Sequence, residues 1–143
     1  MRKRTPKYTL IEHTADFGIH VYGIDRKALF ANAAYALFDL LTDLRRLNGK
    51  TCKNISIRGE DRPDLMVNWL RELLFLWNGN GLLVKEVDVT ALSDSELTAT
   101  VFYDVFDPRR HRINIEIKAV TYHQIRVEPR SPAGWESTII FDV

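Results

Sequence analysis

The amino-acid sequence predicts one α/β domain of the α+β kind, covering residues 1–143, in which two helices pack on a mixed sheet. Its 143 residues are 45% hydrophobic and 27% charged, which suits a single well-filled core. Two stretches repeat apolar residues at helical spacing, whereas most of the remaining chain alternates apolar and polar residues. The resulting order of elements favours a sheet covered by helices. It is also compatible with a strand-helix-strand unit that occurs twice.

The two helices have recognisable ends. The first is expected to begin at the N-cap Asp25 and to run to about Leu41. The second is expected to follow the cap Asp61, since Pro63 is tolerated in a first turn, and to stop in the segment 78–81, Asn-Gly-Asn-Gly. Their apolar stripes are Phe30, Ala33, Ala34, Leu37 and Leu41 in the first helix, and Leu65, Trp69, Leu73, Leu76 and Trp77 in the second.

The remaining periodic segments predict half-buried strands, because apolar residues occupy every second position. These segments are 17–21, 55–57, 87–91, 97–103 and 113–117. The segment 93–95, Ser-Asp-Ser, is a suitable tight connection between the third and fourth of them. We therefore expect these two strands to form an antiparallel hairpin.

Bulk properties exclude several classes of protein. With 20 basic and 19 acidic residues the net charge is +1, so no overall field favours direct binding to nucleic acid. The single Cys52 excludes an internal disulfide framework and a cysteine-based zinc site. Apolar stretches are too short to span a bilayer, and the segment 1–4 leads into no signal-like run. These features predict an intracellular, cytoplasmic protein.

The usual enzyme motifs are also missing. The four histidines, at positions 13, 20, 111 and 123, show no spacing typical of a zinc pair on one helix face. No Gly-x-Ser-x-Gly turn or glycine-rich phosphate loop occurs, and Cys52 has no recognisable Cys-His context. These absences disfavour a zinc enzyme, a nucleophilic-triad enzyme and a phosphate-loop enzyme.

Acidic groups lie near both ends of the chain. Asp16 closes the segment 12–16, Glu-His-Thr-Ala-Asp, and Asp142 is followed only by Val143 and its carboxylate. If the fold brings the three together, their oxygens would suit a hard cation such as Ca²⁺ or Mg²⁺. The alternative is that Asp16 and Asp142 are a helix cap and a solvated surface acid, as most such residues are.

The basic segment 109–112 and Lys118 each have two interpretations. The segment 109–112, Arg-Arg-His-Arg, is expected in a loop, where it could meet phosphate or an acidic partner. A solvated loop is favoured because the whole chain is nearly neutral. Lys118 follows the 113–117 alternation and is expected on the wetter face of a strand, either paired with a carboxylate or simply exposed.

Four motifs occur in order along the chain. They are Glu-His-Thr-Ala-Asp at 12–16, Gly-Glu-Asp at 59–61 before the apolar run 65–74, Lys-Ala-Val-Thr-Tyr-His at 118–123, and Ile-Phe-Asp-Val at 140–143. Together they resemble the archease family over almost the whole length. The resemblance implies a small α/β domain with a strand-helix-strand-strand duplication.

The resemblance also implies a function. Archeases are cofactor-like proteins that activate the RtcB-type tRNA-splicing RNA ligase by promoting its guanylylation and repeated turnover. One has been linked to tuning a tRNA cytosine methyltransferase. The positions that hold a divalent ion in the family, usually taken as calcium, correspond here to Asp16, Asp142 and Val143. Lys118 corresponds to a functional lysine, and His13 is a further candidate, with orientation of its neighbours as its plainer role.

The resemblance leaves three matters open. Hard oxygen ligands suit Ca²⁺, Mg²⁺ and Mn²⁺ alike, so the ion is not specified, and tRNA is expected to be touched only indirectly. A Gly-Glu pair common in the family is replaced by Tyr103-Asp104, which keeps the charge but loses the backbone freedom of glycine. Two other classes remain: a chaperone or interaction module with a structural metal, and a metal-dependent hydrolase, which is disfavoured because no general base is marked.

Overall fold

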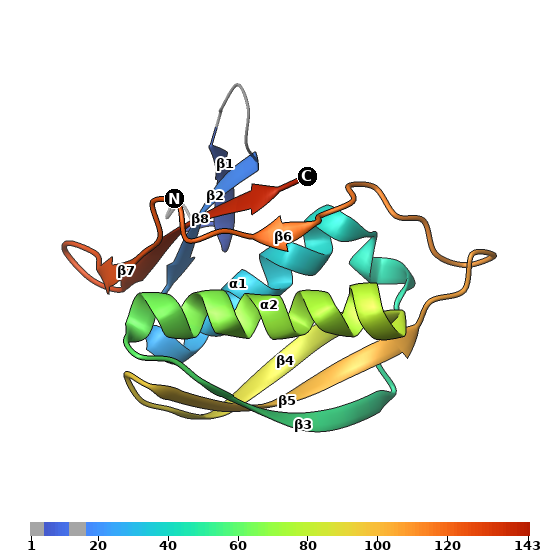
Figure 1. Cartoon of the computed structure of the whole chain (residues 1–143), viewed down its shortest axis with the longest axis horizontal. Coiled ribbons are helices and arrows are strands. Elements are labelled where there is room, and N and C mark those ends of the chain that lie inside the picture. Colours follow the sequence, from blue (N-terminus) through green and yellow to red (C-terminus); the bar gives the residue numbers. More distant parts are fainter. Residues whose placement is uncertain (1–4, 12–16) are drawn as a thin grey trace, which may run out of the picture.

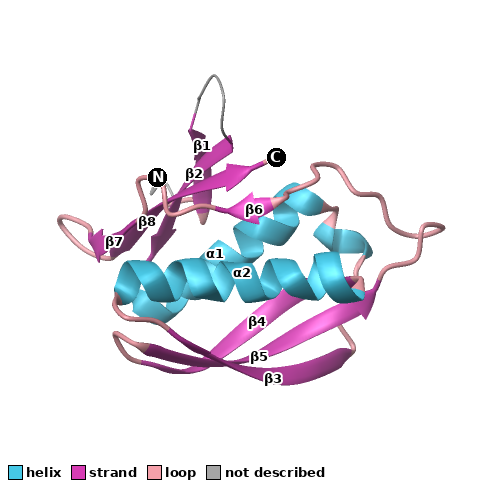
Figure 2. Cartoon of the chain, in the orientation of Figure 1, coloured by secondary structure: helices cyan, strands magenta, loops and turns pink. Residues whose placement is uncertain are grey.

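A computed structural model describes residues 5–11 and 17–143 of the chain (Figure 1). Two helices form a layer between two sheets, and each helix contacts strands of both sheets (Figures 1 and 2). The predicted α+β class, with two helices packed on sheet, is confirmed. The strands are divided between two sheets, and every strand pairing in the described part of the chain is antiparallel.

The larger sheet contains the two ends of the described chain. Its order is β1-β2-β8-β6, and β7 also pairs with β8. The bounds of its strands are β1 (Tyr8–Ile11), β2 (Phe17–Gly23), β6 (Ala119–Val120), β7 (Arg126–Pro129) and β8 (Trp135–Asp142). β8 is therefore the central strand of this sheet, since it pairs with β2, β6 and β7.

The smaller sheet covers the opposite face of the helical layer. Its order is β3-β5-β4, with β3 (Thr51–Arg58), β4 (Leu82–Leu92) and β5 (Glu96–Val105). The predicted hairpin is confirmed, because β4 and β5 pair antiparallel and Ser93 N–H donates to the Glu96 carbonyl at 2.9 Å.

Both helices begin at the predicted caps. The Asp25 side chain accepts from the Ala28 N–H at 2.8 Å at the start of α1 (Arg26–Leu41). The Asp61 side chain accepts from the Asp64 N–H at 2.9 Å at the start of α2 (Arg62–Asn80). α2 ends at Gly81, whose φ of 67° is the left-handed conformation that glycine adopts without strain. A short 3-10 turn, η1 (Leu44–Arg46), follows α1.

The core is centred on the contact between the two helices. Trp69 of α2 is fully buried, and its indole N–H donates to the Phe30 carbonyl of α1 at 2.9 Å. The same core contains Phe38 of α1 and Phe141 of β8, both without exposed surface. Burial of these large apolar side chains is the main favourable term in folding.

The predicted strand at 113–117 is wrong. Only Ile113 forms a bridge, an isolated one with Thr42, and the next backbone amide, that of Asn114, donates to the Leu41 carbonyl at 2.8 Å. The segment thus bonds to the end of α1 rather than to a strand. Its alternation still reports burial correctly, because Ile117 is fully buried and Glu116 is exposed. Alternation of apolar and polar residues indicates that one face of the segment is buried. An extended segment can have a buried face without pairing with another strand.

No helix within the described ranges 5–11 and 17–143 is both long and apolar enough to cross a membrane.

Candidate functional site

The first candidate site is the C-terminal end of β8. Asp142 and Val143 are both exposed there, directly after the buried Phe141. Phe141 is held between two strands, since it pairs with Phe17 of β2 and with Val120 of β6. The site is therefore an exposed acidic end on a buried strand that is paired on both edges.

Lys118 lies beside this end through its backbone. Its N–H donates to the carbonyl of Asp142 at 2.8 Å, and Ala119 pairs with Asp142 in the next step of the ladder. The Lys118 side chain is exposed, as predicted, although the residue precedes β6 rather than lying within a strand. Among the described residues its ammonium group makes no ion pair. The fold thus joins the third motif and the fourth.

His13 and Asp16 lie outside the described residues. The nearest described neighbour in the sequence is Phe17, which pairs with Phe141. The register therefore aligns the residue that follows Asp16 with the residue that precedes Asp142. Within the described part of the chain, no group of three or more His, Cys, Asp or Glu side chains is arranged to hold a metal ion.

The third motif is anchored to α2 as well as to β8. The Arg71 guanidinium of α2 donates to the Val120 carbonyl at 3.2 Å and lies 4.6 Å from the centre of the Tyr122 ring. The Tyr122 hydroxyl donates to the Asp64 carboxylate at 2.7 Å. The Thr121 N–H and hydroxyl both donate to the Ile140 carbonyl. These bonds explain the residue types of Thr121 and Tyr122 structurally, because their side chains fix the motif between the helix and the strand.

The Asp64–Tyr122 bond also sets the charge of both groups. The Glu60 N–H, donating at 2.8 Å, and then the Tyr122 hydroxyl hold the pKa of the Asp64 carboxyl below its usual value. The same hydrogen bond raises the pKa of Tyr122. The pair is thus a carboxylate and a neutral phenol at neutral pH.

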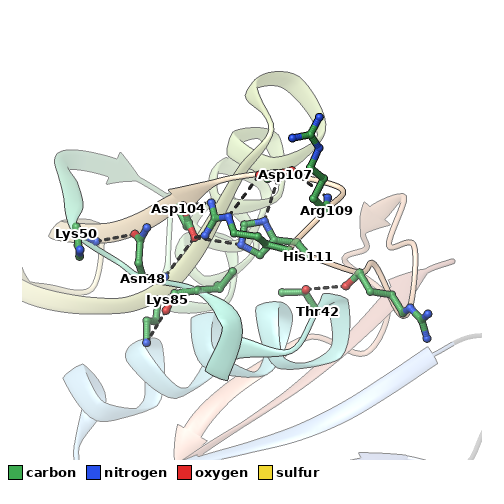
Figure 3. Close-up of polar contacts among 11 residues, drawn as sticks. Thr42, Asn48, Lys50, Lys85, Asp104, Asp107, Arg109 and His111 are labelled. Carbon is green, nitrogen blue, oxygen red and sulfur yellow. Dashed lines mark hydrogen bonds and ion pairs between the residues drawn. The ribbon is translucent and has the colours of Figure 1, made fainter.

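A second polar cluster surrounds Asp104 near the end of β5 (Figure 3). Its carboxylate is 6% exposed and contacts the His111 ring Nε2 at 3.1 Å. It also accepts from the Arg110 guanidinium at 3.2 Å and from the Asn48 N–H at 3.2 Å. Four donor groups, counting both Arg110 nitrogens, therefore converge on one buried carboxylate.

The protonation of this cluster follows from its geometry. The Asp107 N–H donates to His111 Nδ1 at 2.9 Å, so this nitrogen is an acceptor and Nε2 carries the proton that is donated to Asp104. Burial disfavours ionisation of Asp104. Donation from Arg110 and from the Asn48 N–H outweighs this effect and holds the pKa of Asp104 below its usual value.

This cluster corrects the interpretation of the 109–112 segment. His111 is buried, and Arg110 pairs with Asp104 although its side chain is 48% exposed, so these two residues hold the loop in place. Arg109 and Arg112 are exposed, as expected of a solvated loop. The Asp104 carboxylate is thus used inside the molecule. The sequence offered one signal for this cluster, since Asp104 is followed within seven residues by arginine and histidine. That pattern does not reveal which of these side chains is buried.

Comparison with known proteins decides the family. The model of the Archease protein family matches residues 8–143. The chain belongs to the archease family. The archease of Methanosarcina barkeri is 30% identical over 147 residues, covering both chains completely. That of Pyrococcus furiosus is 33% identical, covering 92% of this chain and 95% of its own.

Two solved structures share the archease fold. The solution structure of a protein from Methanobacterium thermoautotrophicum has a TM-score of 0.78 and 28% identity, covering 96% of this chain and 99% of that one. The crystal structure of the Thermotoga maritima archease, described as a possible chaperone, has a TM-score of 0.64 at 23% identity and covers 100% and 99%. The second likeness concerns the fold alone.

Proposed function

We propose that this protein is a cofactor-like activator of an RtcB-type tRNA-splicing RNA ligase, acting in the cytoplasm without catalysing a reaction itself. It would promote guanylylation of the ligase and its repeated turnover. Membership of the archease family supports this proposal. So does the structural observation that carries it, the hydrogen bond from the Lys118 N–H to the Asp142 carbonyl. This bond joins two motifs at one exposed end of the domain.

The proposed site holds a divalent ion through Asp16, Asp142 and Val143. Two features of the described residues fit such a group: Asp142 is an exposed carboxylate without an ion pair among them, and its backbone is fixed by Lys118 and by the β8 ladder. The donors are all oxygens, which suits Ca²⁺ and also Mg²⁺ or Mn²⁺. When bound, the ion would supply positive charge for phosphate oxygens.

The remaining functional residues would be Lys118 and His13. The Lys118 side chain is exposed and its backbone is bonded to that of Asp142, so the ammonium group is available to a phosphate or to a carboxylate of the ligase. As a compact charge on a flexible stem, it can follow a partner group that moves. His13 belongs to the same segment of sequence as Asp16 and is proposed on that ground.

The test is a single-turnover guanylylation assay of the ligase with and without this protein. Asp142→Asn, Lys118→Gln and removal of Val143 should each lower the stimulation. Asp88→Asn, which removes an exposed carboxylate on β4, should leave it unchanged. Calorimetric titration with Ca²⁺ gives an independent reading, because Asp142→Asn should weaken binding of the ion. Full stimulation by all three altered proteins would refute the proposal.

A second candidate is a chaperone or a modulator of a tRNA cytosine methyltransferase, in which the metal is purely structural. The description of the Thermotoga maritima relative as a possible chaperone favours it. It predicts that Asp142→Asn lowers the melting temperature while activation survives wherever the fold does. Measuring both quantities on the same variant separates the two candidates.

A further inference from the structure

A cavity of about 490 Å³ lies between η1 and the loop that follows β5. Four arginines and one aspartate line it, Arg46, Arg109, Arg110, Arg112 and Asp43. The whole chain carries a net charge of only +1. Four arginines and one aspartate give the lining a formal charge of +3, in a concave site that focuses the field.

The fold builds this cavity from two segments that are far apart in the sequence. The Thr42 hydroxyl donates to the Arg112 carbonyl at 2.7 Å, and the Asn114 N–H donates to the Leu41 carbonyl at 2.8 Å. On the other side, buried His111 and Asp104 fix the loop from within (Figure 3). The arginine backbones therefore have defined positions before any ligand arrives, which lowers the entropic cost of binding.

Three of the arginines are available to a ligand. Arg110 already contacts Asp104 at 3.2 Å and Asp107 at 3.4 Å. Arg46 is only loosely paired, since its guanidinium lies 4.0 Å from Asp43 and its side chain is 68% exposed. Arg109 extends away from the Asp104 cluster in Figure 3.

The charges of Arg109 and Arg112 remain uncompensated within the described residues. Both side chains are exposed, and neither makes an ion pair with another described residue. A guanidinium group presents a planar fork of donors that matches the oxygens of a phosphate group. The cavity is accordingly suited to an anion of that geometry.

We infer that this arginine cavity binds the phosphodiester backbone of an RNA strand. No Phe, Tyr or Trp is among the described residues that line it, so the cavity offers contacts to phosphates and no platform for stacking bases. Recognition is therefore independent of base sequence. The choice of RNA as the polyanion rests on the proposed function, and it replaces the expectation that tRNA is touched only indirectly.

The number of arginines that are free to contact phosphates determines the affinity for RNA and its dependence on salt. Three phosphate contacts on a single strand give a slope of log K against log salt of about −2. Each contact contributes roughly a five-fold gain in affinity at 0.1 M salt, so loss of Arg109 and Arg112 together should weaken binding about 25-fold. The expected interaction is weak and is strengthened when the ligase holds the same RNA.

The experiment measures fluorescence anisotropy of a labelled single-stranded RNA with the isolated protein, between about 50 and 200 mM salt. Arg109→Gln/Arg112→Gln should lose about 25-fold in affinity and most of the salt slope. The matched control Lys53→Gln/Arg58→Gln removes the same charge from exposed positions on β3, outside the cavity, and should bind like the unaltered protein. Circular dichroism confirms that both variants fold.

Competition identifies the ligand. Inorganic pyrophosphate should compete poorly and an acidic polyglutamate peptide should not compete at matched charge. Equal binding by the two double variants, or stronger binding of polyglutamate or pyrophosphate than of RNA, would overturn the inference. If the protein binds RNA through these arginines but stimulates no ligase, the proposed function fails and the RNA site stands. If Asp142→Asn abolishes stimulation and RNA binding is absent, the reverse holds.

Discussion

Replacement of Asp104 by alanine should be one of the most damaging single changes in this protein. The carboxylate accepts hydrogen bonds from the Asn48 N–H, the Arg110 guanidinium and the His111 ring. His111 has no exposed side-chain surface, so its Nε2–H would lose its acceptor without access to water. Leaving a buried donor unsatisfied costs about 1–3 kcal/mol, and loss of the charged pair adds to it, so we expect about 3 kcal/mol in total.

The expected change in melting temperature follows from the length of the chain. For 143 residues the entropy of unfolding is about 0.3 kcal/mol/K, so 3 kcal/mol corresponds to roughly 10 °C. Thermal unfolding followed by circular dichroism at pH 7 measures it. Asp104→Asn is the control that keeps the shape and one acceptor oxygen, and it should lose less.

The loss of stability caused by Asp104→Ala should depend on pH in a defined direction. The folded protein holds the pKa of Asp104 below its unfolded value, because donation from Arg110 and Asn48 outweighs burial. The stabilisation is therefore complete above the unfolded pKa of about 3.9 and disappears as the pH falls through the folded pKa. The gap in stability between the unaltered protein and Asp104→Ala should shrink in that acidic range. A gap that is the same at pH 7 and in acid, or a loss within experimental error at pH 7, would refute the reasoning.

Three further changes test other parts of the structure. Trp69→Phe removes the indole donor to the Phe30 carbonyl and should cost about 1–2 kcal/mol in urea denaturation, with an unchanged m-value. Tyr122→Phe removes a donor to Asp64, so the pKa of the Asp64 carboxyl should rise toward its ordinary value in a carbon-detected NMR titration; no change would exclude this hydrogen bond in solution. Gly81→Ala should cost about 1 kcal/mol through its left-handed φ alone, because a Cβ there meets no atom within 4 Å; a larger loss would point to an unrecognised contact.

Features that depend on local sequence could be predicted. The caps Asp25 and Asp61 act on amides three residues ahead, so the sequence alone identifies them. The hairpin at 93–95 is equally local. The strand predicted at 113–117 was wrong because its partner was the end of α1, and that contact spans about 70 residues. Periodicity reports which face is buried and not which element lies opposite.

The candidate sites also contain parts that the sequence shows and parts that depend on the tertiary fold. The motif containing Asp142 and the motif containing Lys118 are visible in the sequence, but their adjacency depends on the register between β6 and β8. The Asp104 cluster could not be predicted, since burial of His111 depends on how the loop returns against β5 and on its stacking against Phe106. The ligand set that includes Asp16 remains a prediction.

The bond between Lys118 and Asp142 has a consequence for how this end of the molecule can change. It is made by the backbone N–H of Lys118, so any residue except proline at this position can keep Asp142 in place. The side chain at position 118 therefore does not determine the position of the Asp142 backbone. Its charge, length and donor number can vary while the scaffold stays the same. A saturation series at this one position would separate the effect of the side chain on the proposed activation from its effect on the fold.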